Sequence, residues 1–314
     1  MIVVDGSPPP LFAVHGQAWG AVVTHVPPRF AAPGGNGKVC GVLTGMDIAS
    51  HEAVVIADDD VRYELDQLQE VARLLQHADL VRPQNYFAPL PWHARWDTAR
   101  TLLNRAVSHD YPGTLGVRRS SLRAAGGYDA GSLFENLELI RTIEAAGGCV
   151  ANRRGFFVRR LPPSRAQFAD QRVRQAYESF AQPARLVAEL ALLPATIALA
   201  RAGRGGSLAA GCVGLVALAE VGRRRARGRA VFPASCSLLA PAWAAERALC
   251  VWIALWLRVR RGGIPYAGET VRKAASSKRT IRRRLRRGRL TRPPGLAGAT
   301  PIGSPCIGSV EPNG

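Results

Sequence analysis

The segment Ala53-Val54-Val55-Ile56-Ala57, followed at once by Asp58-Asp59-Asp60, decides the fold of this chain. Five apolar residues that include Val and Ile are typical of a strand covered on both faces. Three carboxylates stand at its carboxyl end, which is where open α/β sheets bind their ligands. The segment therefore predicts an α/β fold with a ligand site at the end of this strand.

The three carboxylates also indicate what that ligand site holds. Adjacent carboxylates repel each other unless a cation lies between them. Side chains alternate along an extended chain, so Asp58 and Asp60 point the same way while Asp59 faces elsewhere. Carboxylate oxygens suit hard ions such as Mg²⁺ or Mn²⁺, whose coordination shells substrate phosphates can complete. Asp58 and Asp60 are therefore the predicted metal ligands; a plain acidic turn after a strand is the alternative.

Five further segments accompany this one along the chain. They are Ile2-Val3-Val4-Asp5-Gly6-Ser7, Asn36-Gly37-Lys38, Gly126-Gly127-Tyr128-Asp129, Glu135-Asn136-Leu137-Glu138-Leu139 and Gln171-Arg172-Val173-Arg174-Gln175. With Asp58 to Asp60 as the DxD motif, they resemble in order the motifs of the family 2 glycosyltransferases, enzymes of GT-A fold that use nucleotide-diphosphate sugars. The resemblance runs over roughly residues 2 to 180. Each motif alone is weak, and the six in the right order are specific.

The resemblance implies a role for each matching residue. Asp5 is expected to bind the nucleotide base, and Asp58 with Asp60 the metal that bridges the diphosphate. Lys38, Gln171 and Arg174 are expected on the donor side, because Gln171 and Arg174 share one face of a helix and Arg174 can contact the diphosphate. These residues, with Asp58, form the predicted donor-binding set.

Three departures from the family pattern affect the predicted chemistry. The Asp that usually acts as general base is Asn136 here, and an amide cannot accept a proton at neutral pH. Glu135, or failing that Glu138, is therefore the predicted base. The Trp of the last motif is Gln175, and Tyr177 is the closest aromatic residue. The strand that normally precedes Ile2 is absent, so either the true start lies upstream or the sheet lacks a strand.

The net charge of the chain and its distribution limit the classes of binding partner that we expect. The chain has 314 residues and a formal net charge of +19, and eleven of its 42 Lys and Arg lie between Arg272 and Arg292, where no acid occurs. This basic stretch follows apolar segments, which favours an anionic membrane surface; a solvated tail is the alternative. It contains no aromatic residue, so nucleic acid is not an expected partner.

The six cysteines are scattered, with no CxxC pair and no His cluster at zinc spacing. A disulfide framework or a zinc site is therefore not expected.

Apolar segments punctuated by arginines occupy residues 186–200, 207–221 and 231–257. We expect the first two to cross the membrane as one hairpin, with Arg223 to Arg229 on the cytoplasmic side. The third is expected to be an interfacial or re-entrant helix pair bent at Glu246-Arg247. Trp243, Trp252 and Trp256 would then lie near the headgroups. Buried core helices are the alternative. From Lys273 onward disorder is expected.

The combined prediction is an α/β, GT-A-like fold with a mostly parallel sheet and covering helices, followed by membrane-associated helices. The expected boundaries are 1–182 for the glycosyltransferase domain, 183–258 for the membrane-associated region and 259–314 for a basic, mostly disordered tail. The resemblance implies an inverting, hexosyltransferase-like enzyme on the cytoplasmic face of the cell membrane. It would transfer a sugar from a nucleotide-diphosphate sugar to a hydroxyl of a lipid-linked or glycan acceptor. A catalytically inert membrane scaffold in envelope assembly is the alternative.

Overall fold

The computed structural model describes residues 1–29, 36–266 and 269–287. Two short strands, β1 (Ile2–Val4) and β2 (Thr24–Val26), pair in parallel on either side of α1 (Pro9–Trp19) and form a small sheet of their own. The main sheet has five strands in the order β3-β6-β5-β7-β4. These strands are β3 (Ala53–Ala57), β4 (Val61–Arg62), β5 (Leu80–Phe87), β6 (Thr114–Arg118) and β7 (Val150–Arg160).

The prediction of a mostly parallel sheet is wrong for these five strands. β5 and β7 run parallel, whereas the pairs β3–β6, β5–β6 and β4–β7 are antiparallel. β3 lies at an edge, and its residues Val54 to Ile56 are half-buried rather than covered on both faces. An apolar run shows that a strand packs against something, but it does not show how many neighbours pair with it or in which direction.

Helices cover both faces of the main sheet. Leu80 packs into a core with α2 (Gly37–Ile48), α5 (Arg119–Ala124) and α6 (Glu135–Ala145). The next residue, Val81, points to the other face and packs against α3 (Leu65–Leu74). This alternation follows from the two-residue repeat of an extended chain.

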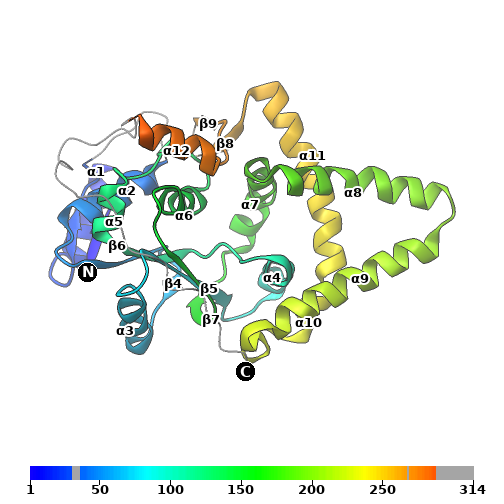
Figure 1. Ribbon diagram of the computed structural model, residues 1–314, viewed down its shortest axis with the longest axis horizontal. Coiled ribbons are helices and arrows are strands. Elements are labelled where there is room, and N and C mark those ends of the chain that lie inside the picture. Colours follow the sequence, from blue (N-terminus) through cyan, green and yellow to red (C-terminus); the bar gives the residue numbers. More distant parts are fainter. Residues whose placement is uncertain (30–35, 267–268, 288–314) are drawn as a thin grey trace.

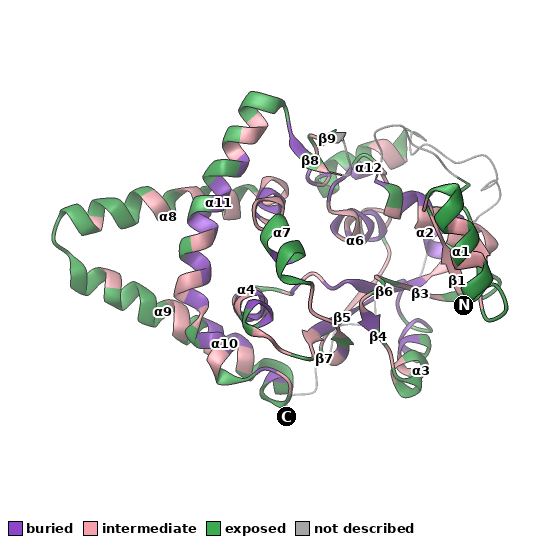
Figure 2. Cartoon of the chain, turned by 180° about the vertical axis from the view of Figure 1, so that it is seen from behind, coloured by how far each residue is buried: buried purple, intermediate pink, exposed green. Residues whose placement is uncertain are grey.

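A second group of helices packs beside the sheet. It comprises α4 (Trp92–Val107), α7 (Arg165–Tyr177), η1 (Glu178–Ala181), α8 (Pro183–Arg201), α9 (Gly205–Arg224), η2 (Arg225–Ala230), α10 (Ala234–Leu238) and α11 (Ala240–Arg261). Figure 1 shows α8 and α9 projecting to one side as a hairpin, with α11 crossing near its base. Figure 2 shows that the hairpin is exposed along most of its length, whereas α11 is buried along one side.

The predicted bend at Glu246-Arg247 is wrong, because α11 runs without a break from Ala240 to Arg261. Both charged side chains have partners that let the helix continue: the indole of Trp96 donates to Glu246, and the buried Arg247 lies 3.9 Å from Glu189 of α8.

The expected headgroup position of the tryptophans is wrong for Trp243 and stays a prediction for Trp252 and Trp256. Trp243 is buried in the core between α4, α9 and α11, whereas Trp252 and Trp256 are exposed.

The segment after α11 is ordered where it is described, contrary to the expectation of disorder from Lys273 onward. β8 (Ile264–Tyr266) pairs with β9 (Glu269–Val271), and α12 (Lys278–Arg286) packs on α6 with Ile281 buried. The carboxylate of Asp129 accepts hydrogen bonds from Lys273 and Arg284, which ties this segment to the sheet domain. Residues 288–314, the remainder of the predicted disordered tail, lie outside the described residues.

Candidate active site

A cavity of about 830 Å³ lies at the ends of β3 and β7, and α6 and α7 also contribute to its wall. Chain segments far apart in sequence contribute to its wall. Among the residues that line it are Lys38, Asp58, Asp59, Asp60, Arg100, Tyr111, Gly113, Glu135, Asn136, Arg160, Gln171, Arg174, Gln175, Glu178 and Tyr266. The cavity therefore contains most of the residues singled out from the sequence.

Asp58 and Asp60 converge on one cation, which is the guanidinium of Arg160 at the end of β7; a turn at Asp59 and Asp60 brings them there, and not the extended alternation expected from the sequence. Asp58 Oδ2 lies 3.2 Å from Arg160 Nη2, and Asp60 Oδ2 lies 2.8 Å from its Nε. Asp59 is exposed and takes no part. Burial, opposed by Arg160, raises the pKa of Asp60 above its usual value. The sequence gives no sign of Arg160, because it lies 100 residues beyond Asp60.

Gly113 makes room for this ion pair. A Cβ atom at this position would lie 2.6 Å from Asp58 Oδ2 and 2.9 Å from the guanidinium of Arg160. Its backbone N–H donates to Asn85 Oδ1 at 2.7 Å, and the N–H of Asp58 donates to its carbonyl. These hydrogen bonds therefore hold the loop before β6 close to the carboxylate of Asp58.

Lys38 is placed by the start of α2. The side chain of Asn36 caps this helix by accepting from the N–H of Lys38, and its amide donates to the carbonyl groups of Ser132 and Leu133. Lys38 Nζ then lies 2.5 Å from Asp58 Oδ1 and 2.6 Å from Glu135 Oε1. Burial works against the charged form, but the two carboxylates outweigh it and raise the pKa of Lys38.

The donor chemistry at Asp58 and Asp60 fits a hard metal ion, because both carboxylates reach a single cationic centre from neighbouring positions. In the described part of the chain, no group of three or more His, Cys, Asp or Glu side chains is arranged to hold a metal. Any ion bound there would therefore need other oxygen ligands, such as those of a diphosphate, and Arg160 would have to release the carboxylates.

The structure places the two candidate bases, Glu135 and Glu138, in different surroundings. Glu135 lines the cavity beside Lys38. Glu138 is 1% exposed, does not line the cavity, and accepts the backbone N–H of Ser276 at 2.5 Å. Asn136 also has a partner, because its side-chain amide donates to the carbonyl of Pro112 at 3.0 Å. Its amide therefore helps to hold the loop before Gly113.

Helix α7 supplies Gln171 and Arg174, which line the same cavity as Asp58. The guanidinium of Arg174 lies over the ring of Tyr266 at 5.1 Å. Tyr177, the aromatic residue closest in sequence to the missing Trp, is fully buried and donates to the carbonyl of Arg272. Tyr266 lines the cavity together with Tyr111 and Phe134, although it follows the helices α8 to α11 in the sequence.

Asp5 does not line this cavity. Its carboxylate accepts the N–H of Ser7 and is shared with two histidine rings, His15 Nδ1 at 2.8 Å and His25 Nε2 at 3.0 Å. Hydrogen bonds from Ser7 and His15 hold the pKa of Asp5 well below its usual range. The sequence pointed to no role for His15 or His25, and the structure brings both of them to the residue predicted to bind the base.

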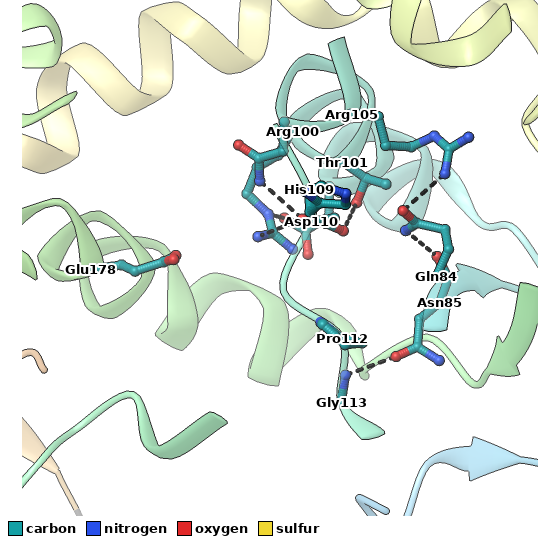
Figure 3. Close-up of polar contacts among 12 residues, drawn as sticks. Gln84, Asn85, Arg100, Thr101, Arg105, His109, Asp110, Pro112, Gly113 and Glu178 are labelled. Atoms are coloured by element: carbon teal, nitrogen blue, oxygen red, sulfur yellow. Dashed lines mark hydrogen bonds and ion pairs between the residues drawn. The ribbon is translucent and has the colours of Figure 1, made fainter. Parts of the chain in front are cut away.

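A buried polar network supports the loop that carries Tyr111, Pro112 and Gly113. Asp110 accepts hydrogen bonds from Thr101 at 2.7 Å and Asn104 at 2.9 Å, and it lies 3.5 Å from Arg100 (Figure 3). Burial opposes ionisation, but Arg100 and these hydrogen bonds outweigh it and lower the pKa of Asp110. An ionised, fully bonded carboxylate fixes the loop, since an unpaired buried charge is costly.

Comparison with known proteins gives one structural likeness. No family model matches the chain, and no curated protein matches it. Among solved structures, the chain is similar to the mannosyltransferase PcManGT from Pyrobaculum calidifontis, determined in complex with GDP-Man and Mn2+. The TM-score is 0.49 and the identity 17%, over 80% of this chain and 77% of that one. A likeness of this size carries no argument about this chain, so the chemistry of the cavity has to be argued from its own residues.

Proposed function

We propose that this protein is a glycosyltransferase that moves a sugar from a nucleoside-diphosphate sugar to an acceptor hydroxyl. The observation that supports this most is the meeting of separate motifs in one cavity. Lys38, Asp58, Asp60, Glu135, Gln171 and Arg174 come from well-separated segments of the chain and line a single space. Residues chosen from an accidental resemblance in sequence order would be expected to lie apart.

The donor diphosphate is proposed to lie between the carboxylate end of β3 and α7. Arg174 has no carboxylate partner among the described residues, so its charge is available to a phosphate oxygen. Gln171, one turn before it on the same face, can donate a hydrogen bond. A Mg²⁺ or Mn²⁺ ion bound by Asp58 and Asp60 would supply charge neutralisation to the departing diphosphate.

Glu135 is the proposed base. It accepts the proton of the acceptor hydroxyl while that oxygen bonds to the anomeric carbon and the bond from this carbon to the diphosphate breaks. A single displacement of this kind inverts the anomeric centre. Lys38, held between Glu135 and Asp58, fixes the base beside the donor site.

The membrane is proposed as the setting of the reaction. Two helices are long and apolar enough to cross it, Pro183–Arg201 and Gly205–Ala230, and only 6% and 11% of their apolar windows are buried. Apolar helices in the core of a soluble protein are mostly buried, which these are not. The start of the first helix and the end of the second attach to the rest of the protein, and the loop that connects them lies at the far end of the hairpin. The catalytic domain would therefore lie on the same side of the membrane as the arginines of η2, which is the cytoplasmic face.

The inert-scaffold alternative has one specific observation in its favour. Arg160 and Lys38 already neutralise the carboxylates that the enzyme would use for its metal and base.

One experiment tests both proposals. Membranes that contain the full-length protein are incubated with a panel of nucleotide sugars and Mn²⁺ or Mg²⁺, and release of the nucleoside diphosphate is measured. Metal-dependent hydrolysis of at least one sugar nucleotide, lost in Asp58→Asn, is expected from the enzyme. No hydrolysis with any of them supports the scaffold.

A further inference from the structure

Arg160 binds two of the three aspartates and is still accessible from the cavity. Its Nε donates to both carboxylate oxygens of Asp60, at 2.9 Å and 2.8 Å, and its Nη2 donates to Asp58 Oδ2 at 3.2 Å. Its side chain is 28% exposed and lines the cavity. The guanidinium therefore neutralises both carboxylates at a place that a ligand in the cavity can reach.

Gly113 shows that the surrounding chain is shaped for this ion pair. A Cβ atom on Gly113 would lie 2.6 Å from Asp58 Oδ2 and 2.9 Å from both Cζ and Nη1 of Arg160. Any larger residue would therefore push the guanidinium and the carboxylate apart. The contact between Arg160 and Asp58 depends on a residue of β7, a residue after β3 and a glycine before β6 together.

A metal ion cannot join these carboxylates without moving Arg160. Lys38 Nζ lies 2.5 Å from Asp58 Oδ1, and Arg160 bonds to the other three oxygens of Asp58 and Asp60. A metal ion and a guanidinium on the same carboxylate would repel each other, so Arg160 has to leave when the metal binds. A cation in a largely buried place is costly without a counter-charge. Metal binding by itself is therefore disfavoured.

A donor diphosphate changes this balance. Its oxygens supply the negative charge that Arg160 loses on leaving Asp58 and Asp60. A guanidinium also matches phosphate oxygens well, because it presents parallel N–H donors to them. Arg160 thus gains a new anionic partner only when the donor is present, and the carboxylates become free for the metal at the same time.

We propose that Arg160 is a positioning residue that couples metal binding to donor binding. It neutralises Asp58 and Asp60 before the donor binds, and it then turns to the diphosphate and frees both carboxylates for Mg²⁺ or Mn²⁺. The inference rests on the proposed glycosyltransferase function. By linkage, the diphosphate strengthens metal binding by the same factor by which the metal strengthens diphosphate binding.

The test measures Mn²⁺ binding by electron paramagnetic resonance, with full-length protein in detergent, alone and with UDP, GDP, CDP or ADP. We expect the wild type to bind Mn²⁺ at least about tenfold more tightly with one of these diphosphates than alone. Arg160→Met should bind Mn²⁺ alone about tenfold more tightly than the wild type, because the competing cation is gone, and should gain less from the diphosphate. Arg153→Met removes an exposed arginine of the same strand that does not line the cavity, and it should behave as the wild type.

Thermal unfolding separates this role from a purely structural one. Without Arg160, Asp58 and Asp60 repel each other, so Arg160→Met should melt below the wild type in EDTA. Mn²⁺ alone should restore its melting temperature, and adding Asp58→Asn to the variant should remove that recovery. A purely structural arginine would leave the variant equally unstable with and without Mn²⁺, which would overturn the proposal.

Two further outcomes would overturn it. In one, Arg160→Met binds Mn²⁺ alone no more tightly than the wild type does. In the other, the wild type binds Mn²⁺ equally well with and without every diphosphate, a result that does not depend on the folding of any variant. Failure of the proposed function is seen separately, as the absence of nucleotide-sugar hydrolysis by the wild type, because none of these binding measurements uses a sugar nucleotide.

Discussion

Among the residues of the site, Arg160 most changes the interpretation of the three aspartates. Asp58 and Asp60 repel each other, and a cation between them relieves the repulsion. The structure supplies this cation from β7, held at 2.8 Å from Asp60 and 3.2 Å from Asp58. This geometry identifies Arg160 as the group with which a metal proposed to bind Asp58 and Asp60 would have to compete.

The first prediction concerns these carboxylates. Asp58→Asn and Asp60→Asn each remove a charge that faces the shared cation, so both should abolish Mn²⁺-dependent binding of a nucleoside diphosphate. Asp59→Asn should have little effect, because Asp59 is exposed and lies outside the pair. Calorimetry with Mn²⁺ and a nucleoside diphosphate measures this. Equal losses at all three positions would indicate a structural acidic turn.

The second prediction concerns the base. Glu135→Gln should lower turnover by roughly 10²- to 10⁴-fold and leave nucleoside diphosphate binding nearly unchanged. Asn136→Asp should not restore a family-like base, because Asn136 donates to the carbonyl of Pro112 and a carboxylate cannot. We expect it to cost about 1 kcal/mol of stability. Turnover and thermal unfolding of both variants check this, and an Asn136→Asp protein with raised turnover and unchanged stability would contradict it.

At the scale of elements, close contact between α4 and α9 fixes the hairpin to the body. A Cβ atom on Gly222 would lie 1.9 Å from the carbonyl oxygen of Leu102, which is main chain and cannot move aside. Gly222→Ala should therefore cost roughly 1 to 3 kcal/mol through overpacking. Gly214→Ala, on the same helix, meets nothing within 4 Å and should cost nothing. Thermal unfolding in detergent compares the two, and equal melting temperatures would mean that α9 does not dock as described.

Helix α12 and the segment before it give a pH-dependent prediction. Burial raises the pKa of Asp129, but hydrogen bonds from Lys273, Gly131 and Arg284 outweigh it and lower the value to about 2. Since the pKa is depressed in the folded state, the stabilisation is fully present above about pH 4, the ordinary value for Asp. It is lost as the pH falls through about 2. Hydrogen exchange should show protection of α12 falling in this window in the wild type. Asp129→Asn should lack that dependence, and an identical pH profile in both proteins would exclude Asp129 as the anchor.

Local sequence patterns predicted individual elements better than their assembly. The apolar run before Asp58 forms the strand β3, and the apolar segments 186–200 and 207–221 fall within the helices α8 and α9. The mixed sheet was not predictable, because pairing direction depends on partners that are distant in sequence. The break at Glu246-Arg247 was predicted wrongly for the same kind of reason. Trp96 and Glu189, which accommodate these charges, lie on other helices.

Prediction of the candidate-site residues had the same limit: residues in local motifs were predicted, and residues outside them were missed. Asp58, Lys38, Glu135 and Arg174 were predicted because each belongs to a local motif, and the structure brings them to one cavity. Arg160 and Glu178 were missed because nothing in their immediate sequence marks them, and the place of Tyr266 at the cavity was missed because the helices α8 to α11 separate it from the other motifs.

At the scale of the whole molecule, exposed apolar side chains gather on the hairpin and on α11. On α11 they follow helical spacing and lie on one face: Leu249, Trp252, Ile253, Trp256 and Val259. Figure 1 shows this helix crossing near the base of the hairpin. A hairpin that inserts into a bilayer would therefore bring α11 toward the headgroups, where tryptophan is favoured. The hairpin and the α11 face together form an apolar surface of the kind that a membrane covers.

The last prediction tests that surface. Ile197 and Val213 lie on α8 and α9 with 43% and 69% of their side chains exposed, so lysine at either position breaks few contacts within the protein. Within a bilayer, however, a lysine at the centre of a helix, where Val213 lies, costs about 2.5 to 3.5 kcal/mol, and one nearer a helix end, where Ile197 lies, adds a smaller cost because its side chain can reach the interface. The double variant Ile197→Lys with Val213→Lys should therefore leave the membrane fraction and keep its helical circular dichroism. Leu65→Lys, an equally apolar and 71% exposed position on α3, is the control and should remain with the membrane. Full-length wild type found wholly in the soluble fraction would mean that another protein surface, and not lipid, covers the hairpin.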